Sequence, residues 1–197
     1  HIRVNNSLKK KKWDRSALTG IELYEKTLGF VGFGRVARLV ASRMQSFGMK
    51  IVFFDPYIDE STQNETKMEL DELLQKSDVV SLHVVKNKET INLISKEKLS
   101  LMKQDAIIIN TSRGGVVDES EVLRLVDNGK LFSAALDVYE QEPPEYTTQL
   151  IESDSITLPH LGASTREAQL KAGSDTIQNV VRILNGDFTP SVNAVDF

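Results

Sequence analysis

The feature that most constrains this chain is a glycine-rich turn, Gly32-x-Gly34-x-x-Ala37. An apolar run, residues 28–31, precedes the turn and predicts a buried strand. After the turn, helical spacing predicts a helix through these residues: Val36, Leu39, Val40, Arg43, Met44 and Phe47. A strand, a turn and a helix in this order predict the first half of a βαβ unit, which commonly binds phosphate groups at the start of its helix.

Each residue of the turn has a physical task if the ligand is a dinucleotide. Gly32 allows the tight turn, and Gly34 has no side chain, so a pyrophosphate can approach the backbone. Ala37 is small enough for the helix to pack against the strand. The N-terminus of the helix offers free N–H groups and a partial positive charge to the phosphates.

One acidic residue, Asp55, selects the dinucleotide. It follows the second predicted strand, about 20 residues after Gly34, where a carboxylate accepts hydrogen bonds from the adenosine ribose. The same carboxylate would repel the 2′-phosphate of NADP, and no arginine directly follows it. We therefore expect NAD as the cofactor.

The composition narrows the class of protein. The chain has 197 residues, no cysteine and a formal net charge of −4. The lack of cysteine excludes disulfides and thiolate zinc sites, and we expect no metal site. The charge argues against a nucleic-acid partner, and no apolar run approaches the roughly 18 residues of a membrane span. We expect a cytoplasmic protein, in which the lysine run Lys9–Lys12 is a solvated loop. Because His1 enters the pattern without a methionine, we expect a piece of a longer protein.

The rest of the chain alternates between short apolar runs and helical segments. Six strands are predicted, at 28–31, directly before Asp55, and at 79–82, 106–109, 131–136 and 155–158. Helices are predicted at 70–75, 96–102, 118–127 and 164–184. Continuous apolar strands that alternate with helices indicate a parallel sheet covered on both faces. The predicted fold class is therefore α/β, a doubly wound parallel sheet of Rossmann type in three αβα layers.

Polar residues follow most of the predicted strands. They are Asp55, His83, Thr111, Ser112, Arg113, Asp137 and His160. Ligands of doubly wound sheets bind outside the carboxyl ends of the strands, so these residues are expected at one edge. His83 fits either a cofactor contact or a structural role.

Three residues in or near these loops are suited to binding a carboxylate or to moving a proton. Arg113 precedes two glycines, and its guanidinium can hold a carboxylate through two parallel hydrogen bonds. If Glu142 lies near His160, the pair can act as a proton-transfer unit, in which the carboxylate fixes the tautomer of the imidazole and raises its pKa.

The order of these motifs resembles that of one known family, the NAD-dependent D-2-hydroxyacid dehydrogenases. The resemblance covers nearly the whole chain, from Ser7 to Ala194, and is carried by the glycine turn with Asp55 and by the segments 110–119, 135–143 and 159–169. The ending Gly162-Ala-Ser-Thr-x-Glu-Ala-Gln169 is typical of the branch that acts on 3-phosphoglycerate. The loop after His83 departs from the family pattern, because it reads Val84-Val-Lys-Asn-Lys88 in place of a proline and a Thr-Pro pair.

The resemblance implies that Arg113, Glu142 and His160 are the catalytic residues, and it implies cofactor contacts as well. The implied cofactor contacts are Gly32, Gly34, Arg35, Val36, Asp55, Val84, Thr111, Ser112, Asp137 and Ala163. The implied reaction is hydride transfer between C2 of a 2-hydroxy acid and NAD. The expected substrate is 3-phosphoglycerate, at the entry to serine synthesis, with glyoxylate, hydroxypyruvate and lactate as alternatives. An NAD-sensing corepressor module and a purely structural dimerising fragment are the non-enzymatic alternatives.

The resemblance also predicts how the chain is divided. Residues 1–27 are expected to be an entry segment, 28–163 the Rossmann NAD-binding domain, and 164–197 a long crossover helix and tail. Most of the substrate domain is expected to be missing. The full-length protein is expected to be a homodimer or a higher homo-oligomer.

Overall fold

The structure, a computed structural model, has two compact units. The first ends at Pro159 and the second begins at His160, and each is described by itself. The structure describes residues 9–11, 13, 19–58, 64–153 and 155–187. Parts of the predicted entry segment and of the predicted tail therefore lie outside the described residues, as does Lys12 of the lysine run.

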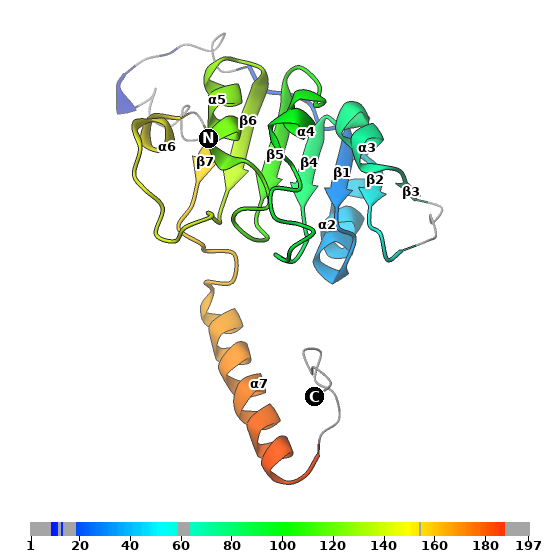
Figure 1. Ribbon diagram of the computed structural model, residues 1–197, viewed down its shortest axis with the longest axis vertical. Coiled ribbons are helices and arrows are strands. Elements are labelled where there is room, and N and C mark those ends of the chain that lie inside the picture. The colour runs from blue at the N-terminus through cyan, green and yellow to red at the C-terminus, as the bar shows by residue number, and fades with distance from the viewer. Residues whose placement is uncertain (1–8, 12, 14–18, 59–63, 154, 188–197) are drawn as a thin grey trace. The chain divides into compact units, whose positions relative to one another are not determined.

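A parallel sheet of seven strands forms the centre of the first unit (Figure 1). In the order β3-β2-β1-β4-β5-β6-β7, every neighbouring pair is parallel. The strands are β1 (Thr27–Val31), β2 (Lys50–Phe54), β3 (Glu65–Lys67), β4 (Val79–Leu82), β5 (Ala106–Asn110), β6 (Leu131–Leu136) and β7 (Ile156–Thr157). The strand order reverses between β1 and β4, which is the switch point where ligands of such sheets bind. The predicted doubly wound sheet is confirmed.

Helices cover both faces of this sheet. Figure 1 shows α3 (Leu70–Lys76), α4 (Lys96–Ser100) and α5 (Glu119–Asp127) arranged across one face. On the other face, α2 (Arg35–Gln45) packs with β1 and β2. A short helix, α6 (Thr148–Glu152), precedes β7.

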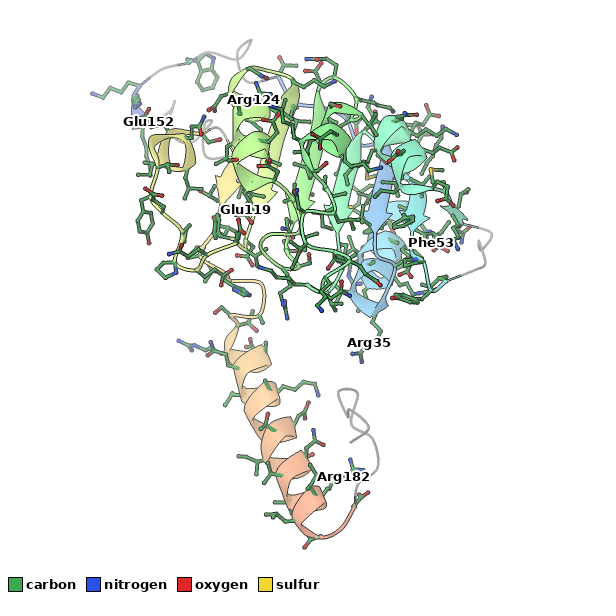
Figure 2. All side chains as sticks on the ribbon, in the orientation of Figure 1. Arg35, Phe53, Glu119, Arg124, Glu152 and Arg182 are labelled. Atoms are coloured by element: carbon green, nitrogen blue, oxygen red, sulfur yellow. The ribbon has the colours of Figure 1, made fainter. Side chains whose placement is uncertain are left out.

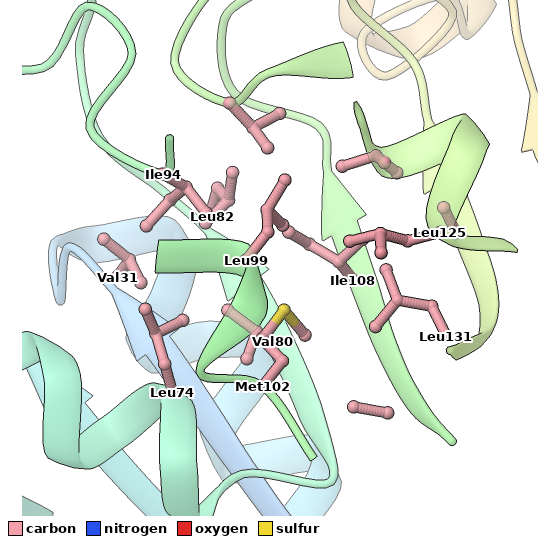
Figure 3. Close-up of a cluster of buried hydrophobic side chains, with 14 of the residues drawn as sticks. Val31, Leu74, Val80, Leu82, Ile94, Leu99, Met102, Ile108, Leu125 and Leu131 are labelled. Carbon is pink, nitrogen blue, oxygen red and sulfur yellow. The ribbon is translucent and has the colours of Figure 1, made fainter. Parts of the chain in front are cut away.

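The larger core cluster lies under α3, α4 and α5 (Figure 3). It joins leucine and valine side chains of these helices to the aliphatic residues of β4 and β5. Its fully buried members include Leu74, Val80, Leu99 and Ile108. Burial of a side chain of this size stabilises a fold by about 1.5–3 kcal/mol, so this cluster fixes the helices on the sheet.

Two elements were missing from the sequence prediction. β3 adds a seventh strand at the sheet edge, and its sequence Glu-Thr-Lys has no apolar run to reveal it. It exists because Ile51, Val52 and Phe53 of β2 pair with it. The other element is α6, where Thr147 caps the helix by accepting a hydrogen bond from the Leu150 N–H.

The predicted helix after the glycine turn is confirmed, but small residues bury it. Ala37 and Ala41 are fully buried, whereas Val36 and Leu39 are more than half exposed. Two alanines in a row along one helix face allow α2 to approach the sheet closely. The apolar spacing thus predicted the helix without identifying its buried face.

The second unit contains one long helix, α7 (Arg166–Leu184). Thr165 begins it, because its side chain accepts a hydrogen bond from the Ala168 N–H. Asn185 ends it, one residue before Gly186 with a φ of 79°. Among the described residues, no helix combines the length and the apolarity needed to cross a membrane.

Candidate cofactor and active site

The glycine turn has the geometry that a phosphate group requires. Gly32 has a φ of 86°, and a Cβ there would lie 2.6 Å from the carbonyl oxygen of His83. A Cβ on Gly34, in contrast, would meet nothing within 4 Å, so open space lies above this backbone. Gly34 is also the N-cap of α2, and no side chain caps the helix there. The free N–H groups of the first turn and the space beside them fit a pyrophosphate.

Asp55 lies directly after β2 and contacts the same turn. Its Oδ2 accepts a hydrogen bond of 2.8 Å from the Phe33 N–H, and its Oδ1 accepts one of 2.9 Å from the Tyr57 N–H. Each carboxylate oxygen has a further lone pair. The residue can therefore hold the turn and still accept hydrogen bonds from ribose hydroxyls.

Aromatic side chains pack around the glycine turn. Phe33 stacks on Phe53 with ring centroids 4.3 Å apart, and the guanidinium of Arg38 lies 5.0 Å from the centre of the Phe33 ring. His83 packs against Phe30 at 5.4 Å, and its Nε2 lies 2.9 Å from Ser81 Oγ. Burial lowers the pKa of His83, so the neutral ring is favoured. These contacts favour the structural role for His83.

The loop after β5 carries Arg113 and is held by Asn110. The fully buried Asn110 donates from Nδ2 to the Arg113 carbonyl oxygen at 2.9 Å. Its Oδ1 accepts hydrogen bonds from the N–H and the hydroxyl of Ser112, at 3.1 and 2.9 Å. The Arg113 side chain is exposed, and its Nη1 donates to the Ser112 carbonyl oxygen at 2.7 Å. The other guanidinium donors can face a carboxylate.

Asn110 was not among the predicted site residues. The sequence did hold a signal for it, since Asn110 ends an apolar strand and precedes Thr-Ser. Asparagine at such a position readily hydrogen-bonds backbone groups a few residues further on and so shapes the loop.

The loop after β6 carries Asp137 and Glu142. Asp137 is 3% exposed, whereas Glu142 is exposed and its Oε1 accepts a hydrogen bond of 3.1 Å from the Tyr139 N–H. The Tyr139 hydroxyl donates to the Leu136 carbonyl oxygen at 3.3 Å, and burial raises its pKa. Glu142 is therefore tied to its own loop through the Tyr139 backbone.

The loops after β5 and β6 lie in direct contact. A Cβ on Gly114 would lie 1.8 Å from the Tyr139 carbonyl oxygen, so only glycine fits there. The structure thus places Arg113 and Glu142 on neighbouring loops, as the strand-end argument predicts.

The other predicted cofactor contacts lie at the ends of neighbouring elements. Arg35 and Val36 are exposed in the first turn of α2, and Figure 2 shows Arg35 extending away from the sheet. Val84 follows β4, and its Cγ1 lies 2.9 Å from where a Gly32 Cβ would be. Thr111 is exposed directly after β5.

His160 and Ala163 belong to the second unit. His160 has a φ of 54°, in the left-handed region that few residues other than glycine adopt. Because Glu142 and His160 belong to different units, their pairing stays a prediction.

Comparisons with known proteins agree with this geometry. The family model described as "D-isomer specific 2-hydroxyacid dehydrogenase, NAD binding domain" matches residues 1–162. A D-3-phosphoglycerate dehydrogenase of Methanocaldococcus jannaschii is 41% identical over 190 residues, which are 94% of this chain and 36% of that protein. A hydroxypyruvate reductase of Thermotoga maritima is 42% identical over 188 residues, which are 93% of this chain and 61% of that protein.

A solved structure has the same fold. The D-lactate dehydrogenase of Aquifex aeolicus, complexed with NAD and lactic acid, matches with a TM-score of 0.85 and 32% identity, over 94% of this chain and 62% of that chain. This chain therefore spans about a third to three fifths of the length of these three proteins. Because the family model covers most of the sequence, the chain belongs to the D-isomer specific 2-hydroxyacid dehydrogenase family and contains its NAD-binding domain.

Proposed function

We propose that the protein containing this chain is an NAD-dependent D-2-hydroxyacid dehydrogenase that acts on 3-phosphoglycerate. The observation that carries the reaction class is the contact between two strand-end loops, one with an exposed arginine and one with an exposed glutamate. The substrate is supported by the 41% identity to a D-3-phosphoglycerate dehydrogenase. The cytoplasm as its location and a homodimer or higher homo-oligomer as its assembly belong to the same proposal.

Each catalytic residue has one task in this proposal. NAD, when bound, supplies the hydride acceptor. Arg113 binds the substrate carboxylate through its free guanidinium donors and polarises the C2 oxygen. His160 takes the proton of the C2 hydroxyl during oxidation and returns it during reduction. Glu142 orients the imidazole and stabilises its charged form.

A second substrate is supported by a specific observation. The relative from Thermotoga maritima, a hydroxypyruvate reductase, is 42% identical to this chain, as close as the phosphoglycerate relative. Hydroxypyruvate is a 2-keto acid, so the same three residues would serve its reduction. Apart from the oxidation level at C2, the two substrates differ in the phosphate group, which residues outside this chain are expected to recognise.

The test is a substrate panel on the full-length protein, with 3-phosphoglycerate, hydroxypyruvate, glyoxylate and lactate. We expect the highest kcat/KM with 3-phosphoglycerate. His160→Gln should reduce kcat by about 10²–10⁴-fold, the usual contribution of a general base, and leave NAD affinity within about threefold.

Glu142→Gln should also reduce kcat, and the matched change Glu145→Gln in the same exposed loop should not. A best substrate other than 3-phosphoglycerate would reject the substrate proposal alone. NAD binding without turnover of any 2-hydroxy acid would reject the enzyme and favour an NAD-sensing module.

A further inference from the structure

Glu119, in the first turn of α5, contacts the backbone of two different loops. Its Oε1 accepts a hydrogen bond of 2.9 Å from the Gly115 N–H, two residues after Arg113. Its Oε2 accepts one of 3.0 Å from the Glu140 N–H, two residues before Glu142. One carboxylate therefore connects the loop that carries the arginine to the loop that carries the glutamate.

We propose, on the basis of the proposed function, that Glu119 is a positioning residue for the dehydrogenase reaction. It fixes the separation of the two loops, so that Arg113 and Glu142 face one substrate together. It contacts neither substrate nor cofactor in this role, and acts only through the backbone of its two partner loops.

The packing around Glu119 shows why the separation of the loops matters. The backbone at Gly114 lies so close to Tyr139 that no Cβ fits between them. The Arg113 loop is held from β5 by Asn110, and Glu142 is held by its own loop through the Tyr139 N–H. The two hydrogen bonds of Glu119 form a side-chain bridge between these two loops and join them from the α5 side.

A purely structural role as a helix cap does not explain these contacts. Asp118 is the N-cap of α5, and its Oδ1 accepts the hydrogen bond of the Glu121 N–H at 2.9 Å. Glu119 is therefore not needed to cap the N-terminus of the helix. Its side chain instead contacts the two loops, and Figure 2 labels Glu119 at the lower end of α5.

The charges around Glu119 make the bridge sensitive to pH. Burial raises the pKa of Glu119, and the negative charge of Glu140 acts in the same direction. The two backbone N–H donors and the positive charge of Lys86, in the loop after β4, oppose this rise without cancelling it. The ionised carboxylate accepts one hydrogen bond at each oxygen, whereas protonation turns one oxygen into a hydroxyl that accepts poorly. The bridge therefore weakens as the pH falls through this pKa.

Glu119→Gln in the full-length protein tests the proposal. Glutamine has the same shape, but its NH2 group cannot accept from a second N–H. We expect kcat/KM to fall by about 10–100-fold, because small misplacements of catalytic groups have effects of this size. NAD affinity, measured by calorimetry, should stay within about twofold. The matched control is Glu121→Gln on the same helix, whose carboxylate pairs with Arg124 and contacts neither loop.

Two further measurements separate positioning from folding. In the reduction direction His160 must be protonated, so titration of the imidazole cannot explain a fall in kcat/KM toward acid pH. Such a fall instead reports the protonation of carboxylates. The part of the fall that comes from Glu119 should be absent in Glu119→Gln. Amide hydrogen exchange should accelerate at Gly115 and Glu140 in Glu119→Gln and stay unchanged in Glu121→Gln.

The outcomes are distinguishable. Unchanged exchange at both amides, or kcat/KM within twofold of the wild type, overturns the positioning role. An equal loss of NAD affinity and kcat/KM would show that Glu119 only stabilises the fold, and would overturn the positioning role as well. If the wild type turns over no 2-hydroxy acid, the proposed function fails and the catalytic role of Glu119 fails with it, whereas the exchange data still decide whether the bridge exists.

Discussion

At the scale of single residues, several side chains of this protein serve the site and the scaffold at once. Asp55 follows β2 where an acid can bind a ribose, and it also accepts a hydrogen bond from Phe33 inside the glycine turn. Asn110 combines three hydrogen bonds that shape the Arg113 loop. Substitution of such residues therefore changes both local geometry and binding.

The charge of Asp55 should decide the choice between NAD and NADP. We expect the chain to bind NAD more tightly than NADP, because a 2′-phosphate beside this carboxylate is repelled. Asp55→Asn should reduce the NAD-over-NADP preference by about tenfold or more, a change of roughly 1.4 kcal/mol. Calorimetry with both cofactors measures this, with Asp127→Asn, at the end of α5, as a control of equal charge. Tighter binding of NADP by the wild type would contradict the assignment.

At the scale of elements, side-chain hydrogen bonds connect the starts of neighbouring strands as well as the loops at their ends. Asp78, directly before β4, accepts a hydrogen bond of 2.8 Å from the Thr27 N–H at the start of β1. Its other oxygen lies 3.0 Å from Nζ of Lys103, ahead of β5. One carboxylate thus joins the beginnings of three neighbouring strands, at the edge opposite the cofactor.

Asp78→Asn should lower the free energy of unfolding at pH 7 by about 1 kcal/mol, the usual value of a partly exposed hydrogen bond. Burial alone would raise the pKa of Asp78, but Thr27, Lys103 and Lys26 together hold it below the ordinary value of 3.8. A lowered pKa stabilises the fold above the unfolded pKa, so the difference between wild type and variant should shrink as the pH falls below about 4.

Urea unfolding between pH 3 and pH 7 measures this difference. Asp71→Asn is the control, because its pair with Lys98 lies on the surface and should contribute about 0.5 kcal/mol or less. A difference for Asp78→Asn that grows toward acid pH would contradict the assigned role.

At the scale of the whole molecule, the proposed catalytic residues come from both compact units, so their assembly into one site is part of the proposal. The cofactor turn, Arg113 and Glu142 belong to the first unit, and His160 begins the second. The chain spans 36% of the M. jannaschii D-3-phosphoglycerate dehydrogenase, so most of that relative has no counterpart here. Cofactor binding and turnover are therefore expected to separate experimentally.

We expect this chain by itself to bind NAD and to turn over 2-hydroxy acids poorly. The glycine turn, Asp55 and the start of α2 are all present, whereas the residues that close over the substrate are expected outside the chain. Calorimetry should give NAD binding close to that of the full-length protein, and a spectroscopic assay of NADH formation should give a kcat at least about 100-fold lower. A full rate from this chain would show that it contains every group the reaction needs.

Local sequence patterns were enough to predict most of the strands and helices and the cofactor. Apolar runs predicted the bounds of β4 and β6 to the residue. The glycine spacing and Asp55 predicted dinucleotide binding, which the match to the NAD-binding family model confirms. The polar edge strand β3 was missed, because its pairing with β2 is set by a neighbour and not by its own sequence.

Only the tertiary structure decided how the strand-end loops are held together. Glu119, between two loops, acts through backbone groups of both loops that fold next to it. Glu119 and Glu140 are far apart in the chain, and they meet because β5 and β6 are neighbours in the sheet. Local patterns carry no record of such contacts, since the free energy that forms them comes from the packing of the sheet and α5 as a whole.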